Sequence, residues 1–377
     1  MSQFIQLHLL TSYPPANLNR DDMGRPKTAK MGGVDRLRIS SQSLKRAWRT
    51  SEMFKSAIDG HLGTRTKKLG IEIYKKFTEG KVAEKEAIEW AKSIAGVFGK
   101  LKGKDSGNAD AAEEKETKKK KGKESDKNPL LTLEIEQLAH ISPGEWDAVM
   151  DLVDKCISEK RAPKLEELEL MRKPEKAVDI ALFGRMLTKN SRDVSIVEFG
   201  EDAACQVSHA ISVHPVVIED DYFTAVDDLN KHEEDAGAAH IGERGFAAAL
   251  FYTYICINKD LLIENLGDNK KLAAQTISAL TETAIKVSPT GMQNSHASRA
   301  YASYVLAEKG EQQPRSLSVA FLKPIESRKY DDDSIAAIKK HQENMDKVYG
   351  SCADFRYSLN AITGEGTMKE LLEFVTK

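Results

Sequence analysis

The segment LNRDDMGRPKTAKMGGVDRLRISSQSLKRAWR, residues 18–49, is the starting point for predicting the fold. Residues 34–39 alternate apolar and charged side chains, which is typical of a short strand. Ser40 and Ser41 then supply N-cap side chains for a helix whose apolar positions recur every three or four residues. The segment therefore predicts a loop, a strand with one cationic face and a helix, in that order.

The same segment is locally basic. It has nine lysines and arginines and three acidic residues between Arg20 and Arg49, whereas the whole chain has 56 basic and 58 acidic side chains. Because the net charge is −2, binding to nucleic acid depends on such local clustering. Gln42, Lys45 and Arg49 share one helical face, and the serines place hydroxyl and amide groups at a helix N-terminus, where phosphates are favoured. Composition alone is also compatible with an ordinary solvated surface.

Apolar periodicity outside this segment predicts both strands and helices. The expected strands are residues 4–11, 178–183, 206–217, 250–258 and 301–306. The expected helical regions are residues 62–99, 131–138, 146–157, 272–285 and 335–349. This mixture indicates an α+β protein. No period of about 20–50 residues repeats within the chain, so any repetition must come from several copies of the protein.

Residues 59–175 are expected to form a separate helical lobe. Within it, residues 102–127 contain no large apolar side chain and cannot bury enough surface to offset the entropy of ordering. We therefore expect a disordered surface insertion there.

Several classes of function lack their usual motifs. There is no GxxxxGK[ST] or GxGxxG motif, so neither nucleotide hydrolysis nor a cofactor is expected. Four widely separated cysteines predict buried reduced thiols, and the lack of a long apolar run predicts a cytoplasmic protein with no membrane contact. Cys205, His209 and His214 could be metal ligands, but structural histidines without a fourth ligand are the simpler interpretation.

Seven motifs in chain order resemble the CasC family, the backbone subunits of type I-E CRISPR Cascade complexes. They are LNRDD (18–22), RISSQSLKRA (38–47), VDIALFGRM (178–186), SHAISVHPV (208–216), YFTAVDDL (222–229), AHIGERGF (239–246) and ENLG (264–267). The region from about 60 to 175 and the region after 287 match weakly. The lysine-rich insertion has no counterpart in the family pattern.

The resemblance implies a fold of the RAMP superfamily: an RRM-like (ferredoxin-like) palm, a helical fingers insertion and a thumb hairpin. On this basis residues 1–58, 176–218 and 246–377 form the palm. Residues 59–175 form the fingers and residues 219–245 form the thumb.

The resemblance also implies roles for individual residues. Positions that match family contacts to guide phosphates and riboses are Arg20, Lys27, Ser40, Gln42, Lys45, Arg46 and Arg49. Positions that match the thumb and the nucleotide it displaces are Arg185, Met186, Tyr222, Phe223 and Thr224. Tyr222 replaces the tryptophan that is usual in the family, and Phe223 is expected to wedge beside the displaced nucleotide. Without the resemblance, both aromatic residues would be taken for core residues of a hairpin.

The implied function is a non-enzymatic subunit that polymerises along crRNA. It would hold the guide phosphates independently of sequence and displace nucleotides at intervals, so that the guide pairs with target DNA in antiviral defence. The implied partners are other copies of the chain, the large, small, CasD-type and CasE-type Cascade subunits, and a recruited helicase-nuclease.

The alternative is a RAMP endoribonuclease that uses Asp21 or Asp22 for acid–base chemistry. A carboxylate beside Arg20 and Arg25 is more simply a salt-bridge partner. His8 could correspond to the histidine base of RAMP endoribonucleases, but no partner for it is evident in the sequence.

Overall fold

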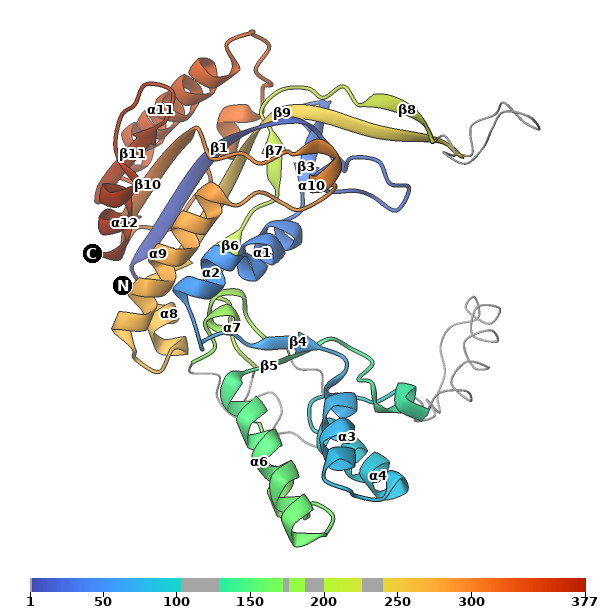
Figure 1. Ribbon diagram of the computed structural model, residues 1–377. Helices are drawn as coiled ribbons and strands as arrows, with labels where there is room; N and C mark the ends of the chain where they lie inside the picture. The colour runs from blue at the N-terminus through green and yellow to red at the C-terminus, as the bar shows by residue number, and fades with distance from the viewer. Residues whose placement is uncertain (1, 103–128, 172–175, 187–199, 226–239) are drawn as a thin grey trace, which may run out of the picture. The chain divides into compact units, whose positions relative to one another are not determined.

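The computed structural model describes residues 2–102, 129–171, 176–186, 200–225 and 240–377 (Figure 1). Contacts divide the chain into two units. Unit 1 comprises Met1–Ile58, Ala204–Glu264 and Asn269–Lys377, and unit 2 comprises Asp59–Ala203 and Asn265–Asp268. Helices and an antiparallel sheet together confirm the predicted α+β fold.

Unit 1 is built on a large antiparallel sheet. Its path of paired strands is β11-β10-β1-β9-β7-β3-β2, and β6 and β8 also pair with β9. The bounds are β1 (Phe4–Ala16), β2 (Thr28–Met31), β3 (Val34–Ile39), β6 (Cys205–Val207), β7 (Ala210–Ser212), β8 (Glu219–Ala225), β9 (His240–Asn258), β10 (Tyr304–Gly310) and β11 (Phe355–Asn360). The predicted strand at 250–258 is thus the second half of β9, and the predicted strand at 301–306 begins three residues later, at Tyr304.

The centre of the sheet is buried on both faces. In β1, every residue from Ile5 to Leu10 is buried, so the strand reads as a nearly continuous apolar run, not as a strict alternation. Helix α9, which runs along the sheet in Figure 1, buries ten of its side chains. On another side, Leu10, Tyr252 and Leu306 form a cluster with Phe321 and Ile338, which come from η4 and α11. Helices therefore supply core on both sides of the sheet.

The helices of unit 1 are mostly short. They are α1 (Ser41–Thr50), α2 (Glu52–Ala57), α8 (Lys259–Asn265, its last residue belonging to unit 2), α9 (Lys270–Lys286), α10 (Gln293–His296), η4 (Ser318–Phe321), α11 (Tyr330–Tyr349) and α12 (Met368–Thr376). Among the described helices, none is both long enough and apolar enough to cross a membrane.

Unit 2 is largely helical around its own core. Its elements are β4 (Thr64–Thr66), α3 (Leu69–Glu79), α4 (Glu84–Ala95), η1 (Pro129–Leu133), β5 (Ala139–Ile141), α6 (Pro143–Glu159), η2 (Leu165–Leu168) and α7 (Val178–Phe183). Ile73, Phe77 and Ile94 pack with Val149 and Val153 of α6, so one cluster joins three helices. The disordered insertion predicted at 102–127 lies outside the described residues, apart from Lys102.

Two predictions about unit 2 are wrong. Residues 178–183 form helix α7, not a strand; five of its six residues are buried, and a short apolar run buried all round has no diagnostic period. Residues 131–138 were expected to be helical, but only a 3₁₀ turn ending at Leu133 forms there. In addition, residues 176–203 belong to unit 2 by their contacts, since the Val178 N–H donates to the His61 carbonyl at 2.8 Å and Asp179 accepts from the Gly63 N–H at 2.8 Å.

A buried ionic cluster joins four neighbouring strands of the unit 1 sheet, β11, β10, β1 and β9. Glu308 on β10 lies 3.1 Å from Nε2 of His8 on β1, accepts from Arg356 on β11 at 2.8 Å, and also binds Arg315. Tyr252 on β9 lies 2.9 Å from Nδ1 of His8. Burial alone would raise the pKa of Glu308, but the hydrogen bonds from His8 and Arg315 hold it well below its usual range. Burial lowers the pKa of His8, against the hydrogen bond and charge of Glu308.

His8 should make stability depend on pH. Its pKa in the folded state lies below the unfolded value of about 6.5, so the unfolded chain takes up a proton first and the protein loses stability as the pH falls below about 6.5. His8→Gln should therefore weaken the decline of the melting temperature between about pH 6.5 and pH 5. Calorimetry across this range measures it, with His341→Gln on α11 as the control. Equal declines in the wild type and His8→Gln would contradict the assignment.

Candidate functional site

The N-terminus of α1 has most of its amide groups already bonded. The Ser40 hydroxyl accepts from the Ser43 N–H at 3.3 Å, and the Ser41 N–H donates to Nδ1 of His209 at 2.9 Å. The Ser40 N–H itself donates to Oδ1 of Asn19 at 2.9 Å. These amides were expected to receive a phosphate, but they are bonded within the cap, to His209 just before β7 and to Asn19 in the loop after β1.

The side chains of α1 divide between core and surface. Leu44, Ala47 and Trp48 are buried, as their spacing predicts. Gln42 and Arg46 are exposed, whereas Lys45 and Arg49 are half-buried. The helix therefore does present cations to solvent, and Arg46 is the most open of them.

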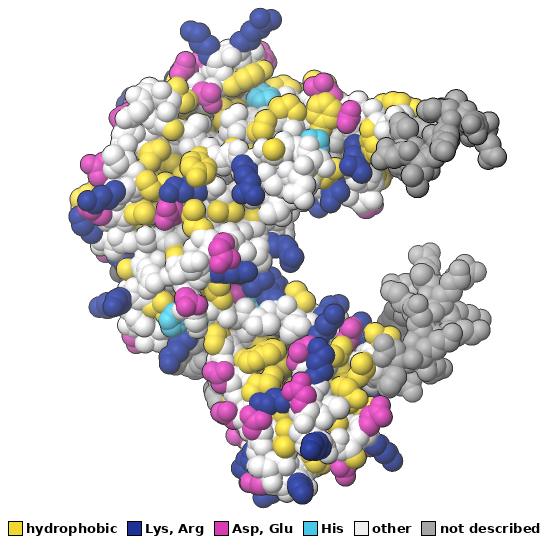
Figure 2. All heavy atoms as spheres, in the orientation of Figure 1, with side chains coloured by type: hydrophobic (Ala, Val, Ile, Leu, Met, Phe, Trp, Pro, Cys, Tyr) yellow, Lys and Arg dark blue, Asp and Glu magenta, His cyan; other side chains and the backbone are white. Residues whose placement is uncertain are grey.

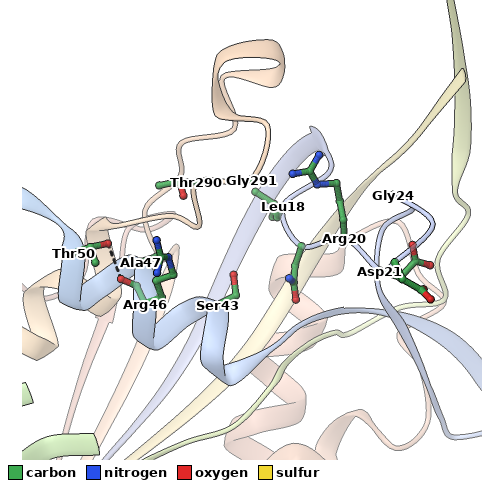
Figure 3. A pocket seen from close by; sticks show the side chains of 12 residues that line it. Leu18, Arg20, Asp21, Gly24, Ser43, Arg46, Ala47, Thr50, Thr290 and Gly291 are labelled. Atoms are coloured by element: carbon green, nitrogen blue, oxygen red, sulfur yellow. Dashed lines mark hydrogen bonds between the residues drawn. The ribbon is translucent and has the colours of Figure 1, made fainter. Parts of the chain in front are cut away.

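A polar pocket of about 520 Å³ opens beside α1 (Figure 3). Ser43, Arg46 and Thr50 approach it from the helix, while Arg20 and Asp21 approach it from the loop after β1, with Thr290 and Gly291 nearby. Two predicted RNA contacts, Arg20 and Arg46, and the two candidate acid–base residues, Asp21 and Asp22, thus line one cavity. In the described part of the chain, neither the Arg20 nor the Arg46 side chain takes part in a salt bridge.

The loop that carries Arg20 is folded tightly by Asp21. Oδ1 of Asp21 accepts from the Met23 N–H at 3.0 Å and from the Arg25 N–H at 2.9 Å. Gly24 has φ +83°, a conformation that other residues rarely adopt. The Lys27 N–H donates to the Asn19 carbonyl at 2.9 Å and closes the loop. Lys27, whose side chain is half-buried, lies immediately before β2.

The loop is also anchored to the hairpin formed by β8 and β9. Nδ2 of the buried Asn17 donates to the carbonyls of Gly24 and Gly245, both at 2.9 Å. Arg25 pairs with Asp220 at 3.1 Å. The pocket and the base of the hairpin are consequently held together by one buried amide and one exposed ion pair.

The hairpin presents two different faces. Phe223 is paired with Gly242, and a Cβ on Gly242 would lie 2.4 Å from the Phe223 ring, so the ring rests on the glycine. The Arg244 guanidinium lies 4.6 Å from the centre of the same ring. Tyr222 is 65% exposed, and strand alternation directs it to the opposite face. Tyr222 is thus the more accessible ring, while Phe223 packs within the hairpin; Thr224 is exposed.

Arg185 and Met186 belong to unit 2. Nη1 of Arg185 donates to the buried Glu145 at 2.7 Å, and the arginine is 5% exposed. Met186 is 93% exposed. The Arg185 side chain is therefore bonded to α6. Its place near a displaced nucleotide stays a prediction.

Arg36 corrects the expectation of a cationic face on β3. It is fully buried and donates to the carbonyls of Ser212 at 2.8 Å and Phe321 at 2.9 Å. Burial lowers its pKa. Arg38 of the same strand is half-exposed. The sequence pattern could not distinguish these two arginines, because both alternate with apolar residues.

Of the three residues considered as metal ligands, the two histidines have structural partners and the cysteine is buried. His209 bonds α1 as described, and burial, Arg38 and Lys27 lower its pKa. Nε2 of His214 accepts from the Leu250 N–H at 3.3 Å. Cys205 is a buried free thiol whose pKa burial raises to about 12. Nothing in the sequence motifs indicated that His209 accepts the first amide of α1.

These features define an α+β protein with an antiparallel sheet, a cationic pocket and an anchored hairpin. Comparison with known proteins then gives the family: the model of the CT1975-like proteins matches residues 5–372, and the chain belongs to that family. No curated protein matches the sequence.

Two solved structures share the fold. A chain of a "CRISPR RNA-guided surveillance complex, pre-nicking" is similar with a TM-score of 0.77 and 25% identity over 99% of each chain. A chain of another "CRISPR RNA-guided surveillance complex" is similar in fold, with a TM-score of 0.57 and 21% identity over 99% of this chain and 98% of the other.

Ser40 tests whether the start of α1 is structural. Ser40→Ala removes the N-cap and should lower the free energy of unfolding by about 1 kcal/mol, while Ser40→Asn should restore most of it. Urea unfolding measures both variants. The salt dependence of RNA binding should stay unchanged, and a flatter dependence at unchanged stability would instead make Ser40 a phosphate contact.

Proposed function

We propose that this protein is the guide-RNA-binding backbone subunit of a CRISPR surveillance complex of the Cascade type. The pocket between α1 and the loop after β1 carries the proposal. There, Arg20 and Arg46, which are outside any described salt bridge, line one cavity in a chain of net charge −2. Guanidinium groups suit phosphate because they present several donors in a planar fork. Because the chain is similar to chains of RNA-guided surveillance complexes, we take guide RNA as the polyanion that binds there.

The side chains around the pocket favour contact with the RNA phosphate backbone over recognition of the bases. Figure 2 shows basic and acidic side chains intermixed over most of one face, in keeping with the net charge of −2. Lys27, Lys45 and Arg49 add half-buried charges along α1 and the adjoining loop. Contacts of this kind fix the position of a strand without reading its sequence, as a protein that serves many guides requires.

The hairpin supports a second contact. The exposed Tyr222 ring can stack on any base, which provides affinity without sequence preference. Since Asn17 and Arg25 tie the hairpin base to the pocket loop, a stacked base and a bound phosphate would keep a fixed separation. This arrangement suits displacement of one nucleotide per copy.

A scaffold is favoured over an endoribonuclease. Oδ1 of Asp21 accepts hydrogen bonds from two backbone N–H groups, so this oxygen is engaged in the turn and is not free to act as a base. His8 has the partners that the sequence did not reveal, Glu308 and Tyr252, but it is 0% exposed and out of reach of a substrate. A general base must come within hydrogen-bond reach of the proton that it removes.

The resemblance to the CasC family adds finer detail to the proposal. It favours a type I-E complex in which several copies stack along one crRNA, with the large, small, CasD-type and CasE-type subunits and a recruited helicase-nuclease as further partners. Target DNA would then pair with the exposed guide bases. Co-purification with RNA of uniform length would support this assembly.

Neutralising the pocket should change the salt dependence of binding. The double variant Arg20→Gln/Arg46→Gln removes two expected phosphate contacts. The slope of log affinity against log salt should therefore decrease in magnitude by about 0.7 per contact, or about 1.4 in total. Titration of a labelled single-stranded RNA at several salt concentrations measures the slope. Lys339→Gln/Lys340→Gln on the exposed face of α11 is the control with the same charge change, and an equal decrease there would count against the pocket.

Tyr222 should contribute through stacking. Tyr222→Ala should weaken RNA binding by about 1–3 kcal/mol for every base tested, whereas Tyr222→Phe should retain most of the affinity. Fluorescence of 2-aminopurine placed along the RNA reports the stacked position. No loss of affinity and no fluorescence change in Tyr222→Ala would assign the contact to another residue.

A further inference from the structure

Two acidic side chains line a pocket whose proposed ligand is an anion. Asp21 and Asp22 both border the cavity that Arg20 and Arg46 enter. A carboxylate close to a phosphate is repulsive, so phosphate binding alone gives no reason for two of them there. A ligand that carries a hydrogen-bond donor as well as a phosphate would explain the two carboxylates.

The carboxylates are not neutralised by the nearby arginines. Arg25, the neighbour expected to pair with them, pairs instead with Asp220 at 3.1 Å. Within the residues described by the structure, no salt bridge involves Asp21 or Asp22. The turn occupies only Oδ1 of Asp21, so its Oδ2 and the carboxylate of the exposed Asp22 remain available as acceptors.

A ribose-phosphate unit satisfies such a pocket. Its phosphate accepts hydrogen bonds from guanidinium groups, and its 2′-hydroxyl donates to a carboxylate. The cavity of about 520 Å³ is within the range of small-ligand sites and is large enough for one such unit. A deoxyribose lacks the donor and would leave the carboxylates facing only negative charge.

We propose that Asp22, assisted by Oδ2 of Asp21, accepts a hydrogen bond from a ribose 2′-hydroxyl of the strand held by Arg20 and Arg46. The pocket thereby selects RNA over DNA. This inference rests on the proposed function and adds to it the part of the nucleotide that is recognised. The chemical reason is that the phosphate supplies affinity common to both nucleic acids, whereas the hydroxyl donor is present only in RNA.

Hydrogen bonds order the loop backbone that carries these acceptors. Asp21 closes the turn through two backbone hydrogen bonds, and Asn17 fixes the following Gly24 carbonyl from beneath at 2.9 Å. A pre-ordered acceptor loses little conformational entropy when the ligand binds. The backbone on which Asp22 stands is therefore ordered before the ligand binds.

The test compares nucleic acids of one sequence that differ only at the 2′ position. Full-length wild type, Asp22→Ala and Asp22→Asn are titrated with labelled single-stranded RNA, DNA and 2′-fluoro RNA, which lacks the hydroxyl donor but retains the sugar pucker of RNA. The wild type should bind RNA more tightly than both analogues. Asp22→Ala should reduce that preference about tenfold, the value of one charge-assisted hydrogen bond, and Asp22→Asn should keep part of it because an amide oxygen still accepts.

The measured quantity is the ratio of the affinity for RNA to the affinity for each analogue. The ratio is used because removing a negative charge strengthens binding to RNA and DNA alike. Asp332→Ala on α11 is the control for this general effect and should leave the ratio unchanged. A wild type that binds RNA without salt dependence would refute the proposed function itself. A wild type that binds RNA normally, with the same RNA preference in Asp22→Ala, would refute only the 2′-hydroxyl contact. Magnesium-dependent RNA cleavage that disappears in Asp22→Ala would overturn the inference in favour of a catalytic carboxylate.

Discussion

The length and pairing of β9 constrain the rest of unit 1. Its second half lies beside β1 in register from Phe4↔Asn258 to Tyr13↔Ala249, where both strands are largely buried. Its first half leaves this core and pairs with β8 to form the hairpin. A single strand of 19 residues therefore carries the rigidity of the core out to Tyr222 and Phe223. Gly245 lies at the transition, where Asn17 of the loop binds its carbonyl.

This constraint explains why the candidate site needs few direct contacts. The loop that carries Arg20 is bonded to the strand that carries the hairpin, and the helix that carries Arg46 is capped by Ser40 and His209. Each functional side chain thus projects from an element whose own polar groups are satisfied elsewhere. Such preorganisation lowers the entropy cost of binding, which for long side chains is about 0.5–1.5 kcal/mol per immobilised group. Hydrogen bonds to backbone groups and the Arg25–Asp220 ion pair provide it.

The sequence predicts the central elements well where one periodicity dominates. Strand β1 and helix α1 begin at the expected positions, because apolar runs, Ser40 and the spacing of Leu44, Ala47 and Trp48 are local signals. Strand β1 continues to Ala16, past its predicted end at residue 11. Helix α7 was missed because its residues are buried on all sides, which removes the period that distinguishes a helix from a strand. A local sequence pattern does not predict the secondary structure of a short segment that the rest of the fold buries on all sides.

The sequence predicted some of the residues that line the candidate site, but not which residues pair with each other there. The motifs identified Arg20 and Arg46, which the structure places in one pocket. They also implied a cationic β3, yet Arg36 of that strand is buried against the Ser212 and Phe321 carbonyls, which are distant in sequence. Likewise, the expected salt bridge of Asp21 or Asp22 with Arg25 does not form, because the hairpin brings Asp220 to Arg25. These outcomes depend on which distant residues meet, and a single sequence carries no such information.

The exchange of partners at Arg25 has a direct consequence for recognition. If Arg25 neutralised Asp21 or Asp22, the pocket would be a simple cationic site. Because Asp220 takes Arg25, the pocket keeps charges of both signs, and a ligand must then offer both an acceptor and a donor to satisfy it. A surface that is uniformly positive attracts any polyanion, whereas a cavity of mixed sign discriminates among them through the groups left unpaired. The hairpin therefore shapes the chemistry of the pocket as well as its position.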